Sequence, residues 1–454
     1  MMDTPAVWEN NPPSKWVSIG LRFRTLLFFI TLAAALLGLG WSFAYGPLWL
    51  PETIKTGLFW CATLVLLYSL IFNGITALVF CMVLLYMPLS SLHLYAPQGE
   101  VAPYFNNFFG MVDRYGLLIL MSTYRLYFVV ALVVVFFNTR ISRFERGAIE
   151  RFAVFCQSMP ILVLEVFALL AMLSAFIYKP NLHLGYAYGT GMTNLLPGNA
   201  WNVLAVVFYC YLIFGRKPAL VKLALVFVPL WFLLNYARVE LLGLFILYAY
   251  YARLQQFNAV QRTVFAASAG LVGVLFIVIG AVRGKGWSNL SSLSVDVLNS
   301  ILNYSTVQDV IYAACAAVQY VYNTGHHYTV LNTWLYAIPS FFLPYDITPG
   351  SLLVSQALKT NNGLLISGEG MLNGGVYGVF LVAAVVLAAF ALTHLLFRSS
   401  TYLTVSIYII TLCSLPRLVW YGFDFYIKNL YFILPLTYAV YLMVLHWSKA
   451  LRRK

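Results

Sequence analysis

Thr25–Tyr45, TLLFFITLAAALLGLGWSFAY, is an uncharged and mostly apolar segment near the start of the chain. About 20 apolar residues in an α-helix are needed to cross the hydrocarbon core of a bilayer, and this segment meets that length. Apolar runs of similar length recur to the end of the sequence. A transmembrane β-strand would instead alternate apolar and polar residues over about 10 positions. We therefore expect an all-α polytopic membrane protein.

The composition supports the same fold class. Of the 454 residues, 62% are hydrophobic and 9% are charged, against about 25% charged in soluble proteins. The net charge of +13 does not indicate nucleic-acid binding, because the lysines and arginines lie mainly in short segments between apolar runs. We expect the lipid bilayer as a partner and no nucleic acid. No low-complexity linker divides the chain, so residues 1–454 are interpreted as a single integral membrane domain.

About twelve transmembrane spans are predicted from the apolar runs. They cover roughly residues 25–45, 57–72, 74–92, 116–137, 153–177, 198–215, 219–236, 239–253, 263–281, 376–395, 401–416 and 430–447. Lys15, Arg22 and Arg24 precede the first run, which we interpret as an uncleaved span and not as a signal peptide. A cytoplasmic N-terminus then returns the C-terminus to the cytoplasm. This orientation places most of the 27 lysines and arginines inside, as the positive-inside rule requires.

One large loop, residues 282–375, is predicted on the extracytoplasmic side between spans nine and ten. Its segment VDVLNSILNYSTVQDVIYAACAAVQYVY has apolar residues at helical spacing, which predicts an amphipathic helix pair at the membrane interface. WLYAIPSFFLPYDITPG follows, and its prolines indicate a re-entrant or interfacial segment. Loops of this length usually carry function.

Charged residues near the outer ends of spans are the first candidates for a functional site, because charge inside a membrane is costly. Arg238 lies at the hairpin between spans seven and eight, Arg283 follows span nine, and Arg417 follows Pro416, which is expected to end or kink span eleven. Three guanidinium groups at a similar depth suit a diphosphate, because arginine offers a planar, bidentate fork to phosphate. Arg238 and Arg417 also have structural explanations.

The structural explanations are local. Arg238 has Glu240 two residues away, and Arg417 has Asp424 seven residues away, so either pair is a candidate ion pair. Arg125, inside span four, is expected to snorkel or to bond to backbone carbonyl groups. Glu165 also lies inside a span. Two roles stay open for it: part of a proton pathway, or a hydrogen-bonded acid that stabilises the fold.

No metal site is expected. The six cysteines have no metal-ligand or disulfide-framework spacing. The outer face has no Asp-x-Asp pair of the kind that holds Mg²⁺ or Mn²⁺ in many sugar transferases. Arginines, and not a metal or another cofactor, are the expected means of neutralising phosphate.

The segment SGEGMLNGGVYGVF, Ser367–Phe380, ends the large loop and enters span ten. Its Glu369, Asn373, Gly375 and Gly378 resemble the Glu-x-x-x-Asn-x-Gly-x-x-Gly pattern of bacterial oligosaccharide repeat-unit polymerases, the Wzy-like O-antigen polymerases. The many spans, the late outer loop and the Pro-Arg pair before the last span are similar too. Arg238 with Leu242 resembles the Arg-x-x-x-Leu of the related O-antigen ligases. The Arg-x10-Gly repeats of some polymerases are absent at Arg238 and Arg283.

The resemblance implies a GT-C-like glycosyltransferase of the bacterial inner membrane that joins undecaprenyl-diphosphate-linked oligosaccharides. A sugar hydroxyl of one lipid-linked unit would attack the growing chain and release undecaprenyl diphosphate. A chain-length regulator and a flippase are implied as partners. The implied catalytic candidates are Glu369 first, then Asp309, His327 and Glu240; the diphosphate-binding candidates are Arg238, Arg283, Lys285 and Arg417; the glycan-binding candidates are Asn373, Trp287 and Tyr328.

Two other functions stay open. An O-antigen ligase has similar parts but transfers the glycan to a lipid A core, and a histidine of the large loop acting with the arginines would favour it. A transporter or flippase for lipid-linked sugars would need a polar path through the membrane. Only Arg125 and Glu165 point to such a path in the sequence.

Overall fold

The computed structural model describes residues 15–44, 50–93, 108–136, 141–178, 198–235, 237–254, 306–325, 350–358, 364–399 and 401–452, together with isolated positions between them. Within these ranges the chain is helical and contains no strand. The helices are α1 (Lys15–Ala44), α2 (Glu52–Phe72), α3 (Ile75–Val79), the π-helix η1 (Phe80–Tyr86), α4 (Met87–His93), α5 (Phe108–Phe136), α6 (Ile141–Gln157), α7 (Ile161–Tyr178), α8 (Gly198–Phe214), α9 (Ala219–Leu234), α10 (Arg238–Leu254), α13 (Thr306–Thr324), α15 (Gly350–Leu358), α16 (Ile366–Ser399), α17 (Tyr402–Tyr421) and α18 (Phe423–Arg452).

Six helices of the described part are long and apolar enough to cross a membrane. They are Phe23–Ala44, Glu52–Phe72, Gly110–Phe136, Ile161–Tyr178, Ile366–Leu392 and Leu430–Trp447. Shorter apolar helices occupy Ile75–Ser90, Ala200–Phe214, Ala219–Leu234 and Tyr402–Leu418. A helix satisfies its backbone hydrogen bonds internally, which hydrocarbon demands. The predicted all-α membrane-embedded class is therefore confirmed, while the number of spans stays a prediction.

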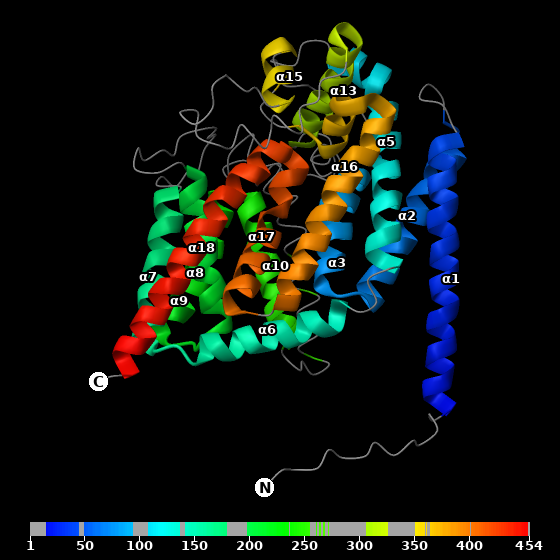
Figure 1. Cartoon of the computed structure of the whole chain (residues 1–454). Helices are drawn as coiled ribbons and strands as arrows, with labels where there is room; N and C mark the ends of the chain where they lie inside the picture. The colour runs from blue at the N-terminus through cyan, green and yellow to red at the C-terminus, as the bar shows by residue number, and fades with distance from the viewer. Residues whose placement is uncertain are drawn as a thin grey trace, which may run out of the picture.

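Every predicted span except 263–281 overlaps a described helix, and 263–281 lies mostly outside the described residues. Figure 1 shows that α1 begins and α18 ends at one end of the bundle, the end crossed by α6, whereas α13 and α15 lie at the opposite end. We call these the α6 end and the α13 end. The arrangement agrees with the predicted separation of the two termini from the large loop.

The bundle is unevenly packed. In the most apolar stretch of α5, 83% of the residues are buried inside the protein, against 28% in that of α1 and 22% in that of α18. The peripheral helices instead expose large apolar side chains such as Leu26 and Phe29 of α1. These outward-facing side chains suit contact with lipid, and α5 forms the centre of one half of the bundle.

The predicted span 153–177 is wrong at its start. Residues Ile141–Gln157 form α6, which lies across the end of the bundle in Figure 1, and the spanning helix α7 begins only at Ile161. One face of α6 is buried through Ile149 and Phe152, and the opposite face exposes Arg146 and Glu150. Pro160 separates the helices, since proline disfavours helical geometry at the residue before it. The predicted cytoplasmic loop is therefore largely an amphipathic helix.

Of the two expectations for Pro416, a helix end or a kink, the helix end is wrong. α17 continues through Pro416 to Tyr421, and only Gly422 separates it from α18. Neighbouring helices in a membrane can compensate for the hydrogen bond that a proline removes, so proline is tolerated inside spans. Gly422 has φ +80, a left-handed conformation that suits glycine. The predicted loop after Arg417 is thus a sharp turn at a single residue.

Two helices of the predicted large loop are described. α13 packs against α5 and α16 at the α13 end of the bundle (Figure 1), and its residues from Val310 to Val318 are all buried. This burial exceeds what an interfacial amphipathic helix requires. α15 lies nearby, whereas the segment predicted to be re-entrant, Trp334–Gly350, lies outside the described residues except at Gly350.

Candidate functional site

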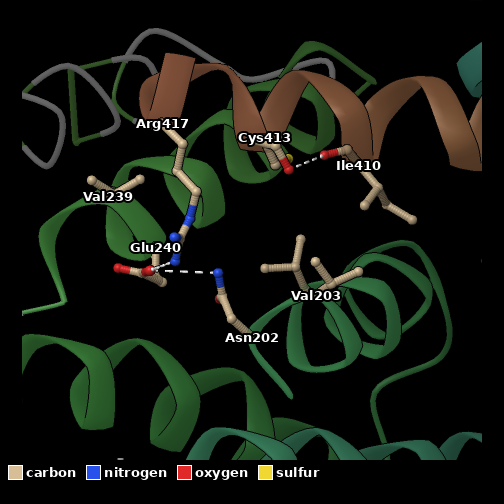
Figure 2. A pocket seen from close by; sticks show the side chains of 9 residues that line it. Asn202, Val203, Val239, Glu240, Ile410, Cys413 and Arg417 are labelled. Atoms are coloured by element: carbon tan, nitrogen blue, oxygen red, sulfur yellow. Dashed lines mark hydrogen bonds and ion pairs between the residues drawn. The ribbon is translucent and has the colours of Figure 1, made fainter. Parts of the chain in front are cut away.

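A buried ion pair joins two helices that are far apart in sequence. Arg417 Nη2 of α17 donates to Glu240 Oε1 of α10, as Figure 2 shows. The two side chains are 9% and 5% exposed, respectively. Both residues lie within about one helical turn of the ends of their helices at the α13 end. A charged pair is thus held inside the protein near the side that carries α13 and α15.

Close packing of α10 against α17 sets the geometry of this pair. A Cβ atom on Gly243 would lie 2.7 Å from the Cys413 carbonyl oxygen, so only glycine lets the two backbones approach this far. Glu240 precedes Gly243 by three residues, and Arg417 follows Cys413 by four residues. Residues at these spacings share a helix face. The contact therefore directs both charged side chains into the same interface.

Two further polar side chains complete the cluster. Tyr178 of α7 donates its hydroxyl hydrogen to Glu240 Oε1 at 3.0 Å, and Asn202 Nδ2 of α8 donates to the same oxygen at 3.4 Å. Arg417 Nη2 also lies 3.3 Å from the Tyr178 hydroxyl oxygen. Glu240 thus accepts from three donors on three helices, an arrangement that suits a fully ionised carboxylate.

A small space lies beside the cluster. It is lined by the ion pair, Asn202 and apolar side chains such as Val203 and Ile410 (Figure 2), and it is about large enough for one water molecule. Asn202 Oδ1 is buried and has no hydrogen-bond partner among the described residues. In this arrangement Glu240 fills the position beside the guanidinium that an external anion would need. A diphosphate can bind Arg417 only if Glu240 gives way.

Glu369 and Asn373 lie at the same end, in the first part of α16. Glu369 is fully buried, and Asn373 Nδ2 donates to the Glu369 carbonyl oxygen at 2.8 Å. A Cβ atom on Gly422 would lie 3.4 Å from Glu369 Oε1. Gly422 follows Arg417 by five residues, about 7.5 Å along a helix. The turn at Gly422 therefore connects the ion-pair cluster with the Glu369 segment.

The glycines of the same segment create a break in α16. Gly374 and Gly375 have non-helical backbone angles, and the φ of Gly375 is +58. The two parts of α16 then touch, because a Cβ atom on Gly378 would lie only 1.7 Å from the Gly370 carbonyl oxygen. Only glycine at position 378 permits this close approach of the two backbones. The predicted span 376–395 begins directly after this break, and α16 as a whole extends from Ile366 to Ser399.

A second polar cluster lies at the α6 end of the same helix pair. Thr76 Oγ1 is hydrogen-bonded to the hydroxyls of Tyr250 on α10, at 3.0 Å, and Tyr408 on α17. Glu145 Oε1 of α6 accepts from the backbone N–H of Ile75 at 3.1 Å. Burial raises the pKa of Glu145 to about 7, against hydrogen bonds from Thr76 and the positive charge of Arg253, which lower it. This carboxyl group is outside the predicted catalytic set.

No family model, curated protein or solved structure matches this chain.

The predicted site residues are only partly brought together. Arg417 and Glu240 form the buried pair, and Glu369 and Asn373 lie beside the turn that follows Arg417. Arg238 begins α10 and Asp309 lies in the first turn of α13, but their side chains lie outside the described part. The remaining candidates, Arg283, Lys285, Trp287, His327 and Tyr328, also lie outside it. Their roles stay predictions.

The ion pair that forms joins one residue from each of the two local pairs proposed from the sequence, Arg238 with Glu240 and Arg417 with Asp424. Arg417 pairs with Glu240, and the side chain of Asp424 lies outside the described residues. Tyr178 and Asn202 were not predicted, although each is a polar residue at the outer end of a predicted span. Glu145 was missed because it lies among arginines in a segment expected to be a loop. Arg125 does bond to a backbone carbonyl, as expected, through Nε to Ser42 O at 2.9 Å.

Proposed function

We propose that this protein is a GT-C-like polymerase of lipid-linked oligosaccharides in the bacterial inner membrane, with its site at the extracytoplasmic face and both termini in the cytoplasm. The observation that supports it most is the convergence of Arg417 and Glu369 at the turn formed by Gly422. A cation for a leaving diphosphate and a carboxylate for an attacking hydroxyl thus come from segments joined at one end of the bundle.

In the proposed reaction, a sugar hydroxyl of the incoming lipid-linked unit attacks the anomeric carbon of the growing glycan. A bond forms between the hydroxyl oxygen and the anomeric carbon as the bond from that carbon to the diphosphate oxygen breaks. Lipid diphosphate leaves with the bonding electron pair. Glu369 accepts the hydroxyl proton, as general bases do. Arg417 stabilises the negative charge that develops on the leaving group. No metal is required for these steps.

In this proposal the diphosphate competes with Glu240 for Arg417. Glu240 holds the Arg417 guanidinium in place until a diphosphate replaces the carboxylate. Glu369 is fully buried, and α13 packs against the same part of α16, where a Cβ atom on Gly368 would lie 3.2 Å from Ala314 Cα. Substrate access to Glu369 therefore requires the helices that bury it to move apart, and α13 is the neighbour of α16 at this end. The resemblance at Glu369 and Asn373 supports the same assignment.

The test is a cell-free assay with purified protein and lipid-linked repeat units. A ladder of polymer lengths is expected from the wild type. Arg417→Ala should lower the rate about tenfold to hundredfold, because a charge-assisted hydrogen bond contributes about 1.5–3 kcal/mol. Arg417→Lys should also be impaired, since lysine lacks the planar fork. Arg151→Ala on α6, an exposed arginine at the other end, is the matched control.

Two results would refute the proposal. One is a normal ladder from both Arg417→Ala and Glu369→Gln, each checked for folding by monodisperse elution in detergent. The other is a wild-type protein that makes no new glycosidic bond. Transfer to a lipid A core instead of chain growth would identify the ligase reaction.

A transporter of the same lipid-linked sugars is the second candidate, and one observation favours it. The α10–α17 pair carries polar clusters at both ends, Arg417 with Glu240 at one and Tyr408 with Tyr250 at the other. Apolar residues such as Val206 and Ile410 line the space beside the first cluster. Movement of labelled lipid-linked sugar across proteoliposomes, without any new bond, would establish transport.

A further inference from the structure

A buried arginine outside the proposed reaction centre lies where α1, α5 and α16 meet. Arg125 of α5 is 5% exposed, and its Nε donates to the Ser42 carbonyl oxygen at 2.9 Å. Its guanidinium carbon lies 4.8 Å from the centre of the Phe43 ring. Ser42 is two residues from the end of α1, so this guanidinium lies near the depth at which α1 reaches the α13 end.

The charge of Arg125 is incompletely compensated. Its Nη1 atom is buried and has no hydrogen-bond acceptor in the part of the chain that the structure describes. No described carboxylate lies within ion-pair distance of it. The last carbonyls of α1 attract a cation, and the Phe43 ring adds a cation–π contact. Neither supplies the anion that a buried guanidinium normally has.

The surface over Arg125 is thin and apolar. Phe43 of α1 and Phe380 of α16 stack with ring centres 5.9 Å apart and planes 5° apart. The two side chains are 42% and 43% exposed, and Leu381 beside them is 40% exposed. Apolar groups on the outside of a membrane helix bundle face lipid. The guanidinium therefore lies against the Phe43 ring, which stacks on Phe380, and both rings are partly exposed on the outside of the bundle.

We propose that Arg125 binds the phosphate headgroup of a membrane lipid that enters between α1 and α16. A phosphate oxygen would accept from Nη1, and the Phe43–Phe380 stack would part to admit it. The apolar surroundings favour an anion that carries hydrocarbon chains over a soluble one, because those chains can lie against the exposed faces of α1 and α16. This site is independent of the proposed polymerase activity and does not require it.

Lipid binding to purified protein in neutral detergent tests the site. Phosphatidylglycerol should raise the thermal unfolding midpoint in a saturable way, and inorganic phosphate at the same concentration should not. Arg125→Gln should weaken the apparent affinity about tenfold or more, as expected for loss of a charge-assisted hydrogen bond. Arg125→Lys should weaken it less. Arg151→Gln, at the α6 end, should bind as the wild type does.

A second measurement leaves Arg125 in place, in case its variants fold poorly. A photo-crosslinking residue at position 43 should label radioactive phosphatidylglycerol, and excess unlabelled lipid should compete. The proposal fails if Arg125→Gln binds like the wild type, if position 43 captures no lipid, or if inorganic phosphate stabilises the protein as well as the lipid does. The last result would indicate a soluble anion instead.

Discussion

Arg417 and Glu240 are each other's main charge compensation inside the bundle, and this predicts how substitutions there affect stability. Glu240→Ala should destabilise the protein by about 3–5 kcal/mol, because it leaves a buried guanidinium unpaired. Glu240→Leu combined with Arg417→Met should restore much of that loss, since removing both charges is often nearly neutral. Unfolding midpoints in detergent measure both effects. A double variant no more stable than Glu240→Ala would contradict a role for the pair in compensating buried charge.

Glu145 predicts how stability depends on pH. Its folded pKa of about 7 lies above the ordinary value of 4.5, so the folded state retains a proton that the unfolded state releases. The contribution of Glu145 to stability is therefore greatest below pH 4.5, falls by at most about 1.4 kcal/mol per pH unit as pH rises toward 7, and is constant above that. Glu145→Gln should lack this fall between pH 5 and pH 7.

Melting curves at several pH values provide the measurement. Glu150→Gln, on the exposed face of α6, is the control and should follow the wild-type profile. The interpretation fails if Glu145→Gln and the wild type lose stability in parallel across this range.

At the level of elements, the broken helix α16 should tolerate substitution at Gly374 but not at Gly378. Gly378→Ala should strongly reduce folding, because its Cβ would overlap the Gly370 carbonyl oxygen at 1.7 Å. Gly374→Ala should be tolerated, because its Cβ would meet no atom within 4 Å and its φ of 179 is extended. Expression level and monodisperse elution of the two variants test this. Equal yields would show that α16 can straighten without cost.

Most helices are predictable from the sequence, because an apolar run of sufficient length is a local signal. α6 was not, because its apolar residues occupy one face only and its last turn merges with the next apolar run. The pairing of Arg417 with Glu240 spans 177 residues and follows from how α10 packs on α17. Sequence neighbours such as Asp424 gave no indication of it. Likewise Glu369 was found from its motif, whereas Tyr178 and Asn202 had no motif to mark them.

For the whole molecule, the bundle predicts opposite exposure of its two ends. Asn323→Cys, at an exposed position near the end of α13, should react with a membrane-impermeant maleimide in intact cells. Arg151→Cys, exposed on α6, should react only after the membrane is opened. All six native cysteines are buried, so background labelling should be low. The reverse pattern would place α13 in the cytoplasm and remove the proposed extracytoplasmic reaction.

The close contact between Gly243 and Cys413 gives α17 a pivot point between its two polar clusters. Arg417 lies about 6 Å along the helix on one side of Cys413, and Tyr408 about 7.5 Å on the other. If a ligand pulled Arg417 sideways, a rigid α17 pivoting at this contact would swing Tyr408 in the opposite direction by a similar amount. The hydroxyl bridge from Tyr408 to Thr76 would then stretch beside Glu145. Ligand binding at Arg417, at one membrane face, would then change the contacts of Tyr408 at the other face, with no ion or substrate passing between them.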